Sequence, residues 1–236
     1  MVIDATFDYP SQRSGLQFPA EPMLLDTCLL QHLKFVMDLA EGEWITQEAA
    51  DEILRRYPSA LGPELIALGN VATVLERNGP PWVVSEISLI EFGRVQGLKG
   101  ESLRRWWFEW AYYADSCSDG GWYPVLDMAS LLLQRGPVVA EGQQALPVEA
   151  TRWPLAPECV PTLGPFLNAG DRALIRVAQR AGIPMILTTD LKSFWRHRRA
   201  LYPLGIEVWR PTDLWMTLCH EQAVEVARWR AFSTRS

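Results

Sequence analysis

The first strongly apolar run of the chain reads Met23-Leu24-Leu25-Asp26-Thr27, and a second run of the same form reads Met185-Ile186-Leu187-Thr188-Thr189-Asp190. Short, continuous apolar runs of this kind are typical of strands that are buried on both faces of a parallel sheet. Each run is followed within three residues by an aspartate. Because ligands of open parallel sheets gather beyond the carboxyl ends of the strands, we expect a site at this edge of the sheet.

Strand-like and helical patterns alternate along the chain. Further strands are predicted at 82–84 and 206–209. Helices are predicted after residue 26 to about 39, from Thr46 through 57, from Pro63 to 78, from Ser85 onward, at 101–117, 168–181, 192–201 and 212–232. Alternating strands and helices predict an α/β fold in which helices cover both faces of a parallel sheet.

Length and composition fit one large domain. The 236 residues are 48% hydrophobic and 21% charged, values that exclude a disordered chain or a coiled coil. Residues 1–20 lack periodicity and are interpreted as an N-terminal arm. Residues 21–236 are predicted to form a single domain, with an insertion at about 98–165 where prolines are frequent between 137 and 165.

Charge, cysteine usage and hydropathy limit which binding sites and locations the protein can have. The net charge is −6, so any binding of nucleic acid must come from a local basic surface. The scattered cysteines and histidines indicate neither a zinc site nor a disulfide framework. No apolar run approaches the roughly 18 residues of a membrane span, so we expect no membrane association and a cytoplasmic location.

Two further acids lie on helical faces where acids are unusual. Glu91 shares a stripe with Ile87 and Val95, and Asp171 shares its face with Leu174. A carboxylate pointing at apolar surroundings costs several kcal/mol unless a cation compensates it. The alternative for Asp171 is a first-turn residue favoured by the helix dipole, and for Asp26 and Asp190 a turn or helix-cap role. Glu86 falls in a first turn and is expected at the surface.

Together the candidate acids are Asp26, Glu91, Asp171 and Asp190. Four oxygen donors without an accompanying cysteine or histidine suit a hard cation, Mg²⁺ or Mn²⁺. The reaction expected of such a set is metal-assisted hydrolysis of a phosphodiester.

The segments that carry these acids resemble the ordered acidic motifs of PIN-domain nucleases. The matching stretches are 24–30, 84–92, 171–175 and 186–194. The resemblance implies a three-layer α/β/α sandwich with helical elaborations and a Mg²⁺- or Mn²⁺-dependent endoribonuclease. Asp26, Glu91, Asp171 and Asp190 would be its catalytic and metal-binding acids, and Thr27 and Thr188 supporting hydroxyls.

This chain departs from the small bacterial members of that family, many of which are toxins of toxin–antitoxin pairs. The intervals from Asp26 to Glu91 and from Glu91 to Asp171 are expanded, and Ser193 stands where the family often has another acid. By analogy, the partners would be RNA, an antitoxin-like protein inhibitor and a second copy of the chain in a homodimer.

A basic segment follows the second aspartate. Arg196, Arg198 and Arg199 are candidates for binding substrate phosphates, and Trp195 for stacking a base. The alternative is a solvated helix face with Trp195 in the core. Trp106, Trp110 and Tyr113 have helical spacing and are interpreted as a packing stripe.

Two other functions stay open at this point. The first is a PIN-like nucleic-acid or protein binding module that no longer cleaves, which Ser193 and the acidic net charge allow. The second is a phosphohydrolase with Asp26 as nucleophile, similar to haloacid-dehalogenase-like enzymes, but Cys28 occupies the position where that family has a second aspartate.

Overall fold

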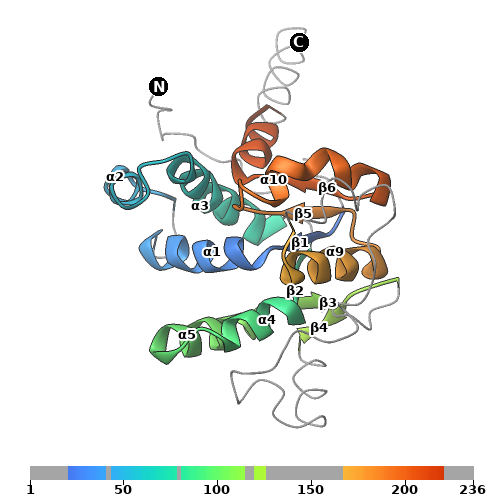
Figure 1. The fold of residues 1–236 in the computed structure, drawn as a ribbon. Helices are drawn as coiled ribbons and strands as arrows, with labels where there is room; N and C mark the ends of the chain where they lie inside the picture. Colours follow the sequence, from blue (N-terminus) through green and yellow to red (C-terminus); the bar gives the residue numbers. More distant parts are fainter. Residues whose placement is uncertain (1–20, 41–43, 79–80, 115–119, 126–166, 221–236) are drawn as a thin grey trace, which may run out of the picture.

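The computed structural model describes residues 21–40, 44–78, 81–114, 120–125 and 167–220 (Figure 1). Within them, six strands form one sheet in the order β4-β3-β2-β1-β5-β6. The strands are β1 (Met23–Leu25), β2 (Trp82–Ser85), β3 (Tyr112–Ala114), β4 (Tyr123–Pro124), β5 (Met185–Leu187) and β6 (Glu207–Trp209). All neighbours pair in parallel except β3 and β4, which are antiparallel. The predicted α/β fold is confirmed.

Helices connect the strands. They are α1 (Thr27–Ala40), α2 (Gln47–Arg56), α3 (Leu61–Asn78), α4 (Glu86–Gly93), α5 (Gly97–Trp107), α9 (Ala169–Ala181) and α10 (Phe194–His197), with the 3₁₀ helix η1 (Arg198–Leu204) and helical residues 211–220. Several begin or end at the residues the sequence predicts. Thr46 and Ser85 cap α2 and α4 with their side chains, and Gly182 ends α9 in the left-handed conformation.

Alternate residues of the central strands enter two separate cores. Met23 and Leu25 of β1 belong to one hydrophobic cluster, whereas Leu24 belongs to the other. β5 repeats this division. Because successive side chains of a strand point to opposite faces, a strand that is apolar throughout needs cover on both sides.

Helices supply that cover on both faces of the sheet, which makes three layers in all. Residues of α1, α3 and α5 pack in the first cluster, and residues of α9 in the second. Figure 1 shows α1, α3 and α5 on one side of the sheet and α9 on the other. The architecture is therefore an α/β/α sandwich, in which β1 and β5 are neighbouring inner strands of the sheet.

Two predicted helices differ from those observed. The segment predicted as a helix at 101–117 is helical only to Trp107, and Tyr112–Ala114 joins the sheet as β3. Trp110 still contacts Trp106 edge to face at 5.2 Å. The helix predicted at 192–201 is the short α10 followed by η1. Aromatic spacing alone did not distinguish helix from strand, because β3 is too short to show a period of two.

The arm at 1–20, residues 115–119 and 126–165 of the expected insertion, and residues 221–232 of the closing helix lie outside the described residues. α5 and β3, which fall in the first part of that insertion, are integral to the sandwich. No helix in the described part of the chain is long and apolar enough to cross a membrane.

Candidate functional site

Asp26 stands directly after β1, at the carboxyl end of the central strands. Its backbone N–H donates to the carbonyl of Leu187, the last residue of β5, at 3.1 Å. Leu25 and Leu187 are register partners, so both strands end at the same level. The side chain of Asp26 is buried, with 5% of the residue exposed. A strand-end aspartate is thus enclosed at the centre of the fold.

Thr188 links Asp26 to Asp190. Its Oγ1 donates to Asp26 Oδ2 at 2.8 Å and accepts from the backbone N–H of Asp190 at 2.8 Å. Thr188 itself is completely buried. One hydroxyl therefore links the first acid to the turn that carries the last.

Asp190 organises the turn that follows. Its Oδ1 accepts from the backbone N–H groups of Lys192 at 2.8 Å and of Ser193 at 3.0 Å, and its Oδ2 accepts from the Ser193 hydroxyl. Burial raises the pKa of the Asp171 carboxyl, and the hydroxyl of Ser193 lies close enough to oppose part of that rise. Ser193 therefore stands between two of the candidate acids.

Asp171 occupies the third position of α9 and closes a capping box with Asn168. Its backbone N–H donates to Asn168 Oδ1 at 2.8 Å, and its Oδ2 accepts from the backbone N–H of Asn168 at 3.2 Å. The residue is 9% exposed. The first-turn position that was the alternative for Asp171 is present, and the capping box, which the sequence did not predict, leaves part of the carboxylate for other contacts.

Glu91 is half-buried in α4 and reaches across to α9. A Cβ placed on Gly170 would lie 2.3 Å from Glu91 Oε1, so the carboxylate occupies the space that a larger residue would fill. Val95, expected to extend the stripe of Glu91, lies beyond the end of α4 at Gly93. Glu91 therefore lies beside the helix turn that holds Asp171.

The four acids act on one another electrostatically. Burial raises the pKa of Asp26 to about 7, against the effect of the Thr188 hydrogen bond, and the charges of Asp171, Asp190 and Glu91 raise it further. Burial likewise raises the pKa of Asp171 to about 6, with further contributions from Asp190 and Glu91. Like charges that are partly removed from water favour the protonated forms.

No positive side chain compensates this cluster within the described residues. None of the four acids forms an ion pair with a described lysine, arginine or histidine. In the same part of the chain, however, no three Asp, Glu, His or Cys side chains stand in an arrangement ready to hold a metal ion. The acids are electrostatic neighbours but not an assembled metal centre.

The first turns of α1 add two residues that the sequence did not single out as site members. Cys28 is exposed, yet desolvation of its sulfur and the charges of all four acids raise the pKa of its thiol. One turn later, His32 Nδ1 is hydrogen-bonded to Thr189 Oγ1 at 2.8 Å. This face of α1 therefore borders the acids. Thr27 instead donates to Ser88 Oγ at 3.0 Å and ties α1 to α4.

The predicted basic residues lie in different environments. Arg196 and Arg199 are exposed. Arg198 is half-buried, and its guanidinium carbon lies 3.9 Å from the centre of the Trp195 ring. Arg196 and Arg199 are thus the members of this segment that face solvent.

Asn168 and Gly170 also belong to the site. A local sequence pattern could have indicated Asn168 but not Gly170. An Asn three residues before an acid is a capping-box pattern. Gly170 gives no such signal. A glycine is needed there because Glu91, 79 positions earlier in the sequence, occupies the space of a side chain. Comparison with protein-family models, curated proteins and solved structures found no match to this chain.

Proposed function

We propose that the protein is a Mg²⁺- or Mn²⁺-dependent endoribonuclease of the PIN-like kind. Asp26, Glu91, Asp171 and Asp190 would hold the cation, RNA would be the substrate, and the cytoplasm the expected location. One observation carries the proposal. A buried carboxylate whose pKa is raised to about 7 lies among three further acids that have no described counter-cation.

The donor set fits a hard cation. All four side chains supply carboxylate oxygens, which Mg²⁺ and Mn²⁺ prefer to nitrogen or sulfur. Neutralising this cluster would offset the repulsion that raises the pKa values of Asp26 and Asp171. Because the side chains are not assembled as a metal centre, binding in this proposal includes movement of the carboxylates.

A divalent cation bound there would activate water and stabilise the leaving oxygen of a phosphodiester. The residues of the chain set up that chemistry. Thr188 orients Asp26 through its hydroxyl, and Ser193 together with two backbone N–H groups orients Asp190. Arg196 and Arg199, which are exposed, would hold the phosphates of the substrate on the acidic protein.

A second candidate is a PIN-like module that binds nucleic acid or protein without cleaving it. Two observations favour it: Ser193 stands where the related nucleases often have an acid, and the acids of the described residues are not assembled as a metal centre. Both candidates use the same fold and the same exposed arginines, and they differ only in whether bonds of the nucleic acid are broken.

Cleavage assays distinguish the two. Metal-free protein is mixed with labelled single-stranded and hairpin RNAs in Mg²⁺, Mn²⁺ or chelator, beside Asp26→Asn and the exposed-acid control Glu101→Gln. The nuclease proposal expects cleavage with metal, none in chelator, none by Asp26→Asn and full activity of Glu101→Gln. RNA binding without cleavage under every metal condition would overturn it in favour of the binding module.

A further inference from the structure

Trp195 lies at the end of the turn that begins with Asp190. Its backbone N–H donates to the Asp190 carbonyl at 3.1 Å, while Lys192 and Ser193 donate to the Asp190 carboxylate. The half-buried indole packs against the cluster that includes Phe194 and the residues of α9. The indole therefore packs directly beside the turn that carries Asp190.

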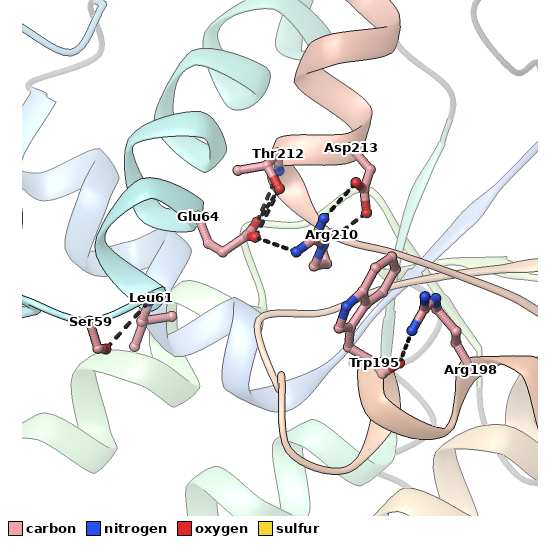
Figure 2. A network of polar contacts seen from close by, with 8 residues as sticks. All are labelled: Ser59, Leu61, Glu64, Trp195, Arg198, Arg210, Thr212 and Asp213. Atoms are coloured by element: carbon pink, nitrogen blue, oxygen red, sulfur yellow. Dashed lines mark hydrogen bonds and ion pairs between the residues drawn. The ribbon is translucent and has the colours of Figure 1, made fainter.

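Two arginines hold the indole. The guanidinium carbons of Arg198 and Arg210 lie 3.9 and 4.1 Å from the centre of the Trp195 ring. Two guanidinium groups cannot both stand that close above one face, and Figure 2 shows the ring between them. Both faces are therefore occupied by cations, an attractive arrangement that leaves none for stacking a base.

Each arginine is itself anchored. Arg198 Nη1 donates to the Trp195 carbonyl at 2.9 Å. Arg210 makes two hydrogen bonds to Asp213, at 2.9 and 2.8 Å, and lies 3.4 Å from Glu64. A bidentate arginine–carboxylate pair is geometrically specific, so Asp213 and Glu64 fix the position of the Arg210 guanidinium.

Glu64 extends the network to α3. It is 3% exposed, and its carboxylate accepts from the backbone N–H of Thr212 at 3.0 Å and from the Thr212 hydroxyl at 2.8 Å. Figure 2 shows these contacts joining α3 to the helix that begins at 211. A continuous chain of polar contacts thus runs from α3 through Arg210 to the indole next to the Asp190 turn.

We propose that Trp195 is a positioning residue for Asp190: the indole, clamped between Arg198 and Arg210, holds the turn at 190–193 so that the Asp190 carboxylate stays at the edge of the acid cluster. The inference rests on the proposed function only in taking Asp190 as a cation ligand. The clamp itself is a claim about the turn, and it can be measured without metal or RNA.

Amide hydrogen exchange of metal-free protein measures the clamp. Trp195→Ala should speed exchange at the amides of Lys192 and Ser193 about tenfold, and Trp195→Phe clearly less, because an aromatic ring remains between the arginines. Arg198→Gln, which removes one face of the clamp and is milder, should act in the same direction. Trp110→Ala, a half-buried tryptophan outside this network, should leave these amides unchanged.

Unchanged exchange at Lys192 and Ser193 in both Trp195→Ala and Arg198→Gln would overturn the inference, as would an equal increase in Trp110→Ala. A second readout connects the clamp to the site. Mn²⁺ affinity should fall several-fold in Trp195→Ala and recover in Trp195→Phe. If the wild-type protein binds no Mn²⁺, the proposed function fails, while the exchange data still decide for or against the clamp.

Discussion

The carboxylate of Glu91 lies in the space that a side chain at Gly170 would occupy. A Cβ at Gly170 would meet Glu91 Oε1 at 2.3 Å and Asn168 Oδ1 at 3.1 Å. Glycine at this position therefore lets an acid from α4 approach the first turn of α9, where Asp171 is held. The relationship joins two acidic motifs that the sequence separates by 80 positions.

Gly170→Ala should lower cleavage without lowering the stability of the protein. The added methyl group displaces the Glu91 carboxylate, so metal-dependent cleavage should fall at least tenfold. Because alanine is favoured over glycine in a helix by about 0.5–1 kcal/mol, the free energy of unfolding should not fall. Cleavage rates and denaturant titration of the same variant provide both measurements.

Two variants test this reason for the loss. Gly121→Ala adds a methyl group where nothing lies within 4 Å and should leave cleavage unchanged. Shortening the acid in the double variant Gly170→Ala/Glu91→Asp should recover part of the activity relative to Glu91→Asp alone. Full activity of Gly170→Ala would show that the position of Glu91 is unimportant.

Asp26 predicts an unusual pH dependence of stability. Its pKa is raised from 3.8 to about 7 in the folded protein. Between these values the folded state binds more protons than the unfolded state, so the stability of the metal-free protein should fall as the pH rises from about 4 to 7. Asp26→Asn should flatten this part of the curve and stabilise the metal-free protein at pH 7. A stability that rises through this range, with no difference between wild type and Asp26→Asn, would contradict a raised pKa of the buried Asp26 carboxyl.

The two glutamates of α4 are predicted to differ. Glu86 stands in the first turn, where a negative charge is favoured by the helix dipole, and Glu91 lies five residues later against α9. Glu91→Gln should lower cleavage by orders of magnitude with folding intact. Glu86→Gln should cost at most about 1 kcal/mol of stability and leave cleavage nearly unchanged. The reverse outcome in the same assay would exchange their roles.

The exposed arginines are predicted to set the salt dependence of RNA binding. Replacing Arg196 and Arg199 with glutamine removes two cations, each worth about 0.7 in the slope of log K against log salt for a single strand. Arg198→Gln should change the slope less, since this guanidinium is stacked on Trp195. An unchanged slope in the double variant would assign both arginines to an ordinary solvated surface.

The strands and their terminal acids were predictable because their signals are local. Uninterrupted apolar runs followed by Asp26 and by Thr188–Asp190 indicate buried parallel strands, and the structure has both as neighbouring inner strands of the sheet. β3 was not predictable. Its three residues adjoin tryptophans whose spacing is also that of a helix, and its pairing with β2 decides its conformation.

Contacts across long sequence intervals explain what else was missed. His32 meets Thr189, and Glu64 meets Thr212, over intervals of 157 and 148 residues that no local pattern spans. The base-stacking interpretation of Trp195 depended on its place in a basic segment directly after the Asp190 strand end. It did not include Arg210, which lies between β6 and the helix that begins at 211 and which the fold brings to the Trp195 ring.

Binding of Mn²⁺ to metal-free protein, followed by electron paramagnetic resonance, shows whether the four acids form a divalent-cation site. We expect saturable binding by the wild type and by Glu101→Gln, and loss of that binding in Asp26→Asn. Absence of saturable binding in the wild type, or equal binding by Asp26→Asn, would contradict it.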